Sequence, residues 1–334
     1  MTSVRIEPHI LPSEYSALKT GAGLVDRSGR ARWRFSGERA AETLTGLVTN
    51  DVVALIAGQG QYAAVLTAKG KIVADVRILR LADTLIVDVP ALAAPGFADV
   101  IKKYVNPRVT PYTDETASLS AFGVYGALAA HTVGPVVGVA LDVLTSLPAY
   151  GHVTTDSGLV MRVPGINGFE IFTPADQRDA LQQRFVAAGA IVCSPATWDI
   201  VRVEAGSAEW GIDIDDTTIP QEADLDERGA ISYTKGCYTG QETVARIHFR
   251  GHVNRHLRGL RLVGVALPPV RSSLYDATGK PVGDTRTAVY SPRLSGIALG
   301  LVRREIEPGA TVAVRWEGGE TSATVTPLPF PDAA

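Results

Sequence analysis

The chain has 334 residues, 46% of them hydrophobic, which is enough for two or three domains with their own cores at ~100–200 residues per domain. Its 32 basic and 35 acidic residues give a net charge of −3, which excludes a uniformly basic nucleic-acid-binding protein. The two cysteines, Cys193 and Cys237, exclude a disulfide scaffold and a self-contained iron–sulfur site built from cysteine alone.

Neither a membrane segment nor a targeting signal is predicted. Residues 1–8 lack the apolar core of a signal peptide, and no run reaches the ~20 apolar residues that cross a bilayer. The apolar stretch from Gly123 to Val139 is interrupted by His131, Gly134 and Pro135. Because cysteine is also scarce, we expect a cytoplasmic protein that makes no membrane contact.

The first two thirds of the chain are predicted to alternate irregularly between helices and strands. Apolar residues at helical spacing predict helices, and short apolar runs between turn signals predict strands. The predicted helices cover residues 40–48, 95–104, 127–133, 176–188 and 197–205. The predicted strands cover residues 61–66, 71–81, 84–89, 118–124, 158–163 and 169–172. This mixture is typical of an α+β fold.

The last part of the chain, from about Leu257, changes to short strands separated by proline and glycine turns. The predicted strands cover residues 257–263, 288–290, 297–302, 311–316 and 321–326. Several short strands at such spacing predict a small β-barrel.

One polar, glycine-rich segment, residues 233–246, surrounds the thiol of Cys237. If this segment is extended, Lys235, Cys237 and Thr239 point to the same side, so an ammonium lies beside the sulfur and favours the thiolate. The glycines on either side let another group approach the backbone closely. A turn whose cysteine is merely small explains the same residues equally well, so the pattern alone leaves the function open.

The octapeptide Lys-Gly-Cys-Tyr-Thr-Gly-Gln-Glu at residues 235–242 resembles the signature of the YgfZ family of folate-binding proteins. That family belongs to the superfamily of the glycine-cleavage T-protein, an aminomethyltransferase that uses tetrahydrofolate. The resemblance continues at residues 46–51, 66–71, 198–206 and 219–222, so it spans most of the chain. The residues that carry the signature here are Lys235, Gly236, Cys237, Tyr238, Gly240, Gln241 and Glu242.

The resemblance implies an α+β fold of three modules arranged as a ring around a central hole. Two intertwined α/β modules are expected over residues 1–245, and a β-barrel over residues 246–334. The resemblance places a folate in the central cavity with Cys237 near it. It also implies support for the assembly or repair of iron–sulfur enzymes, including those that thiomethylate tRNA, with these enzymes or assembly factors as partners.

Four residues outside the signature are implied contacts of the folate. Trp198 matches a tryptophan whose indole stacks on an aromatic ring of the ligand. Arg202, one helical turn later, can donate two N–H bonds from its guanidinium to a carboxylate of the folate. Glu170 matches a glutamate that accepts N–H bonds from the pterin edge, and Asp75 lies in the first hairpin. The structural alternatives are a core tryptophan, an arginine paired with Glu204 or another acid, a surface glutamate and a solvated aspartate.

Two departures from the T-protein pattern concern the activity. The paired acids in the first hairpin of the T-protein become Ala74 and Asp75 here, so the pair is incomplete, and aminomethyltransferases lack the cysteine signature. The first prediction is therefore a tetrahydrofolate-binding accessory factor for iron–sulfur proteins, in which Cys237 is a nucleophile, thiol relay or transient cluster ligand tuned by Lys235. The alternative is a folate-dependent aminomethyl or methyl transferase, a one-carbon enzyme.

The segment after the signature contains two further patterns. His248, His252 and His256 recur at every fourth position, but residues 247–263 are predicted to be extended, so no metal site is expected. A stripe of arginines offers a contact for tRNA, a phosphate or the polyglutamate tail of folate, although a solvated strand is the simpler interpretation. The stripe consists of Arg246, Arg250, Arg255, Arg258 and Arg261.

Overall fold

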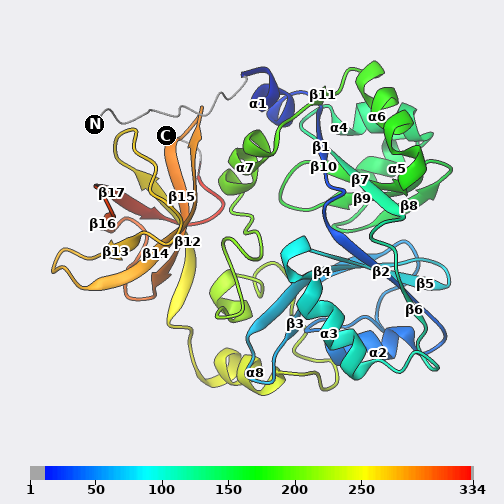
Figure 1. Cartoon of the computed structure of the whole chain (residues 1–334), viewed down its shortest axis with the longest axis horizontal. Coiled ribbons are helices and arrows are strands. Elements are labelled where there is room, and N and C mark those ends of the chain that lie inside the picture. Colours follow the sequence, from blue (N-terminus) through cyan, green and yellow to red (C-terminus); the bar gives the residue numbers. More distant parts are fainter. Residues whose placement is uncertain (1–11, 332–334) are drawn as a thin grey trace.

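The structure is a computed structural model that describes residues 12–331 and has three lobes (Figure 1). A five-stranded sheet and a six-stranded sheet form two of the lobes, and a closed β-barrel forms the third. This arrangement confirms the predicted α+β fold with a C-terminal barrel. The predictions about residues 1–8 lie outside the described residues. Within residues 12–331 no helix is long and apolar enough to cross a bilayer.

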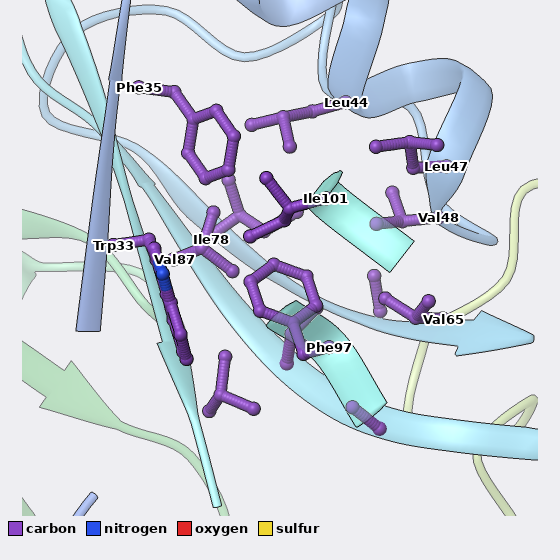
Figure 2. Close-up of a cluster of buried hydrophobic side chains, with 14 of the residues drawn as sticks. Trp33, Phe35, Leu44, Leu47, Val48, Val65, Ile78, Val87, Phe97 and Ile101 are labelled. Carbon is purple, nitrogen blue, oxygen red and sulfur yellow. The ribbon is translucent and has the colours of Figure 1, made fainter. Parts of the chain in front are cut away.

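The five-stranded sheet is antiparallel and carries helices on one face. Its strands, in spatial order, are β3 (Gly60–Leu66), β4 (Ile72–Arg80), β5 (Thr84–Val89), β2 (Ala31–Ser36) and β6 (Tyr112–Asp114). The helices are α2 (Ala40–Leu47) and α3 (Ala94–Tyr104), with a short 3-10 turn, η1 (Ala91–Ala93), before α3. Figure 2 shows the core between the sheet and the helices. In this core the rings of Trp33 and Phe97 pack edge to face, with their centroids 5.0 Å apart.

Strand β4 shows how alternation of residue type creates two different faces. Its residues Ala74, Val76 and Ile78 are buried in the helix-covered core. Asp75 and Arg77 lie between them in the sequence and therefore point to the opposite face of the sheet. A sheet face that carries charged residues and is also covered by protein needs partners for those charges.

The six-stranded sheet is interrupted in sequence by the whole of the five-stranded sheet, which makes the two modules intertwined. Strand β1 pairs parallel with β11 and antiparallel with β7. In spatial order the strands are β11 (Ile191–Val192), β1 (Gly23–Asp26), β7 (Leu119–Tyr125), β10 (Gly168–Pro174), β9 (Gly158–Val163) and β8 (His152–Thr155). The helices of this module are α1 (Pro12–Lys19), α4 (Ala129–Val137), α5 (Leu141–Ser146) and α6 (Arg178–Ala187), and a 3-10 turn, η2 (Ala175–Gln177), precedes α6.

The two sheets meet through their faces that carry no helices. Leu79 and Ile86 of the first sheet pack against Leu159, Met161 and Phe172 of the second. The opposite face of the second sheet forms its own core with α4 and α6. The charged residues of β4 therefore lie at the edge of a buried interface between modules.

Helix α7 (Pro195–Glu204) joins the α/β modules to the barrel. It begins at Ser194, whose hydroxyl accepts a hydrogen bond from the Thr197 N–H, and at a proline in the first turn. Ile200 and Val203 pack against barrel residues, whereas Trp198 packs toward α1 and β7. A long irregular segment with the 3-10 turn η3 (Pro220–Ala223) then leads to α8 (Gln241–Arg250).

The barrel closes by pairing its first strand with its last. Its strands, in spatial order, are β12 (Arg255–Leu262), β15 (Ser295–Arg303), β14 (Pro281–Ser291), β13 (Ser273–Tyr275), β16 (Thr311–Trp316) and β17 (Gly319–Thr326). Five of these strands were predicted from the sequence, and the three-residue β13 was not.

Helix α8 corrects the prediction that the segment from Ile247 onward is extended. Gly240 adopts a left-handed conformation with φ of 83° and starts the helix, which buries Val244 and ends before Gly251. The predicted boundary between residues 245 and 246 falls inside α8, and the first barrel strand begins at Arg255.

Candidate functional site

A cavity of about 230 Å³ lies where the two sheets, α7 and the segment after α7 meet. It brings together all four of the predicted folate contacts, Asp75, Glu170, Trp198 and Arg202, from three elements far apart in the sequence. Ile214, Ala223 and Leu225 provide an apolar side of the same cavity and are also buried in one hydrophobic cluster. A concave site with apolar walls and a few convergent polar groups is the usual form of a small-molecule site.

Asp75 is a buried carboxyl group with one oxygen free. Its Oδ2 accepts a hydrogen bond of 2.7 Å from the Tyr62 hydroxyl, while Oδ1 is buried without a partner among the described residues. Burial raises the pKa of Asp75, although Arg30 acts in the opposite direction. The group therefore suits proton transfer or acceptance of an N–H bond from a ligand.

Glu170 is buried as a carboxylate with fixed partners. It accepts hydrogen bonds from Arg77 at 2.7 Å and from the Tyr125 hydroxyl at 2.8 Å, and Arg27 lies 3.6 Å away. Burial alone would raise the pKa of Glu170, but the Arg77 guanidinium reverses this effect and holds the pKa below its usual range. The structural alternative of a surface glutamate is thus wrong.

An ion cluster that was not predicted from the sequence lies behind this carboxylate. Asp88 is fully buried and accepts hydrogen bonds from Arg30 at 2.6 Å and from Arg77 at 2.6 and 2.8 Å, with Arg32 3.3 Å away. Arg77 therefore links Asp88 to Glu170 and joins the two sheets electrostatically. The available signal was the charged residues that alternate with apolar ones along β2, β4 and β5.

Trp198 offers the cavity a hydrogen-bond donor. Its ring stacks on Tyr125 with centroids 4.4 Å apart, and the Arg27 guanidinium lies 5.1 Å from the ring centroid. The indole Nε1–H is buried and has no partner among the described residues. An indole N–H usually finds a partner when it is buried, so a bound ligand is a natural acceptor for it.

Arg202, a predicted ligand contact, lines the cavity and is also paired within the protein. Its guanidinium donates to Asp199, to Asp213 at 2.6 Å and to Thr287 of the barrel at 2.9 Å. All three of its nitrogens are therefore satisfied within the protein, and Arg202 ties α7 to the barrel. The alternative prediction was a pairing with Glu204 or another acid. The acids that pair with Arg202 are Asp199 and Asp213, whereas Glu204 accepts hydrogen bonds from residues of α1 and the barrel.

Arg228 is the cavity-lining arginine that remains available. It is exposed and donates to the carbonyl oxygen of Gly206, and no carboxylate pairs with it within residues 12–331. The other four arginines that line the cavity each have at least one carboxylate partner: Arg27, Arg30, Arg77 and Arg202. The sequence gives no signal that separates Arg228 from these four.

The signature segment lies outside the cavity lining; residues 235–240 are irregular rather than extended, and Gln241 and Glu242 begin α8. Cys237 is exposed, and Tyr238 is buried beside the apolar wall residue Leu225. The Lys235 ammonium donates to the Thr45 carbonyl and lies 4.3 Å from the centroid of the Tyr238 ring. Burial lowers the pKa of Lys235 to about 8, although Asp51 and Cys237 act in the opposite direction.

The three histidines after the signature do not form a cluster with metal-ligand geometry. Across the described part of the chain, no group of three His, Cys, Asp or Glu side chains is placed to hold a metal ion. His248 stacks on Tyr233 with ring centroids 3.7 Å apart and lies 3.5 Å from Asp226.

Comparison with known proteins agrees with this architecture along the whole chain. Residues 7–232 match the model of the GCVT N-terminal domain, and residues 255–332 match the glycine cleavage T-protein C-terminal barrel domain. The aminomethyltransferase of Thermosynechococcus vestitus is 30% identical over 95% of this chain and 87% of its own length. That of Rubrobacter xylanophilus is 29% identical over 96% and 86%.

A solved structure shows the same fold. The glycine cleavage system aminomethyltransferase T from Bartonella henselae superposes with a TM-score of 0.86 at 22% identity, covering 96% of this chain and 89% of the other. Both domain models, in their expected order, and relatives of nearly the same extent lead to one assignment. The chain belongs to the glycine cleavage T-protein family.

Proposed function

We propose that this protein binds a tetrahydrofolate in the cavity and transfers the one-carbon unit that the folate carries. The observation that carries this proposal is the buried Oδ1 of Asp75, which has no partner among the described residues and belongs to a side chain that lines the same cavity as the carboxylate of Glu170. The relatives named above are aminomethyltransferases, which favours the transferase over the accessory role that the sequence analysis put first.

The donor set of the cavity fits such a ligand. A reduced pterin presents N–H groups to carboxylates and ring atoms that accept a bond from an indole N–H, and the cavity holds Asp75, Glu170 and the free Nε1–H of Trp198. Tetrahydrofolate supplies the nitrogen atoms that carry the one-carbon unit. Asp75 holds or releases a proton at its free oxygen, because burial keeps its pKa raised.

Arg228 completes the proposed site at the acidic end of the ligand. A folate ends in a glutamate, and a guanidinium binds a carboxylate through two parallel N–H bonds. Among the arginines that line the cavity, Arg228 is the one that has no carboxylate at ion-pair distance among the described residues, although its charge acts on the carboxyl group of Asp224. It therefore takes the role that the sequence analysis gave to Arg202.

The test is an assay of the purified protein with tetrahydrofolate and an aminomethylated lipoyl carrier, measuring methylenetetrahydrofolate. Asp75→Asn keeps the shape of the side chain but removes its proton chemistry, so we expect the rate to fall by about 100-fold or more. Asp83→Asn, at an exposed turn of the same sheet, is the matched control and should retain the wild-type rate. A wild-type protein without turnover, or an undiminished Asp75→Asn rate, would contradict the transferase.

The accessory role in iron–sulfur assembly remains a second candidate because Cys237 is exposed, outside the cavity and within the resembled signature. An exposed thiol is accessible to a partner protein, whereas a thiol in the cavity would meet only the folate. If this role holds, Cys237→Ala keeps folate binding and loses support of iron–sulfur enzymes in cells. Full support of those enzymes by the variant would rule out a role for the thiol.

A further inference from the structure

The turn between β3 and β4, helix α8 and the segments on either side of α8 line a groove of about 400 Å³. Figure 1 shows the position of α8 below β3 in this view. Four basic side chains line it: Lys69, Lys71, Arg246 and Arg250. The one acidic residue in its lining, Glu222, is already held by Arg255 with two contacts of 3.1 Å. The groove is therefore strongly positive in a protein whose net charge is −3.

The basic side chains of this groove differ in their pairing from those of the cavity. Lys69, Arg246 and Arg250 are exposed and have no ion-pair or side-chain hydrogen-bond partner within residues 12–331. Lys71 donates to the carbonyl of Thr217 rather than to an acid. Arg246 and Arg250 are one helical turn apart, so they project from the same face of α8.

Close packing holds the two walls of the groove together. Gly70 has φ of 76°, and a Cβ added there would lie 2.7 Å from the Thr243 Cβ at the start of α8. Gly240 has φ of 83°, and an added Cβ would lie 2.5 Å from the Thr67 carbonyl oxygen in the turn. Glycine is therefore required on both sides of the contact, and the groove is preformed.

An exposed aromatic residue lies beside the charges. Phe249 is 66% exposed and lies on α8 next to Arg250, with its ring edge toward Tyr233 and His248. Protein interfaces combine aromatic and arginine anchors of this kind with a charged rim. Cys237, also exposed, lies four positions before Gln241, the first residue of α8.

We propose that this surface, the α8 groove with Phe249, is the docking site for an acidic protein partner. Lys69, Arg246 and Arg250 pair with its carboxylates, and Phe249 packs on an apolar spot between them. The groove continues into an adjoining cleft, which shares Glu222 and Ile247 with it. The lining of that cleft has more Asp and Glu than Lys and Arg residues. A phosphate backbone that continued past α8 would be repelled there, so a protein fits the groove better than RNA does. Arg255, one of the five arginines in the predicted tRNA contact, is paired with Glu222.

The test measures binding of a fluorescein-labelled peptide of about twelve residues, rich in glutamate with two leucines, by fluorescence anisotropy at low salt. We expect Arg246→Gln/Arg250→Gln to weaken binding about tenfold and Phe249→Ser about threefold. Arg304→Gln, in the adjoining cleft, is the matched control and should bind as the wild type does.

A charge-reversal variant distinguishes the loss of the arginine contacts from misfolding. Arg246→Glu/Arg250→Glu should lose the glutamate peptide and gain binding of a matching lysine–leucine peptide, which a damaged fold would not do. Equal peptide binding by wild type and Arg246→Gln/Arg250→Gln would overturn the proposal. So would tighter binding of a single-stranded RNA of about twelve nucleotides that depends on the same arginines, because it would assign the groove to nucleic acid.

Discussion

The cavity and the α8 surface are both rich in arginine, yet they use it in opposite ways. In the cavity, buried guanidiniums are matched by buried carboxylates, as in the cluster of Arg30, Arg77, Asp88 and Glu170. On α8, Arg246 and Arg250 are exposed to solvent, and no carboxylate of the described residues forms an ion pair with either of them. The first arrangement holds a small site rigid, and the second leaves charge available for another molecule.

The comparison also separates the two chemical features of the chain. The carboxylates that suit a pterin lie in the cavity, whereas the signature residues Lys235 and Cys237 lie outside its lining, near the start of α8. Ligand binding and contact with a partner are therefore assigned to different surfaces. Each prediction below tests whether a substitution in one region leaves the other unchanged.

The largest expected effect is on stability and belongs to the cavity. Asp88→Asn leaves the guanidiniums of Arg30, Arg32 and Arg77 buried without their shared counter-charge, so we expect a loss of about 3–5 kcal/mol in the free energy of unfolding. Urea denaturation measures it. Arg250→Gln, on the α8 surface, should change stability by less than about 0.5 kcal/mol. Equal effects of the two substitutions would remove the distinction between the regions.

A smaller effect is expected on ligand affinity at the mouth of the cavity. Arg228→Gln loses the proposed carboxylate partner, so tetrahydrofolate should bind about tenfold more weakly. Tetrahydropteroate, which lacks the glutamate, should bind wild type and variant equally in isothermal titration calorimetry. If wild type binds tetrahydrofolate and Arg228→Gln matches it, the arginine is not the contact although the folate site stands.

We expect the carboxyl group of Asp224, which lines the cleft next to the α8 groove, to make the free energy of unfolding depend on pH. Burial, with a contribution from Glu227, raises the pKa of Asp224 to about 6. A carboxyl group whose folded pKa is raised stabilises the fold while protonated, below its unfolded pKa, and this stability is lost as the pH rises through about 6.

Asp224→Asn should remove that loss. Asparagine tolerates the left-handed conformation at this position, where φ is 55°, so the backbone is kept. Above pH 6 the variant should be more stable than wild type by about 1–2 kcal/mol, and at pH 4 the two should be nearly equal. Urea titrations at a series of pH values measure the difference. A constant difference across that range would show that Asp224 does not titrate as described.

The smallest expected effect is at the signature thiol. Because Cys237 is exposed and absent from the cavity lining, Cys237→Ser should leave the tetrahydrofolate affinity unchanged and alter stability by less than about 0.5 kcal/mol. A weaker affinity in the variant would mean that the thiol reaches the ligand and that the two regions act as one site.

The sequence predicted the features that depend on local patterns. The barrel strands were predictable because turn residues flank each short apolar run. The helix from Pro195 was predictable because its capping residues come directly before residues that form an apolar face. The short β13 has too few residues to show a period. Helix α8 was missed because Gly240 starts it from a left-handed conformation, without a capping side chain.

The candidate site was predictable only in part, for a physical reason. Glu170 and Asp75 were found through a family resemblance, and the structure brings them to one cavity. Arg202 also lines this cavity, but its guanidinium is paired with Asp213 and Thr287, which the loop after α7 and the barrel bring to it. Which arginine stays unpaired depends on such long-range contacts, and no local pattern encodes them.

The most direct test is a crystal structure of the protein soaked with tetrahydrofolate. We predict the pterin in the cavity, with its N–H groups at Asp75 and Glu170 and its glutamate at Arg228, and with the Cys237 sulfur beyond bonding distance of the folate nitrogens. Folate bound on the α8 surface, or in contact with Cys237, would contradict the division between a ligand cavity and a partner-binding surface.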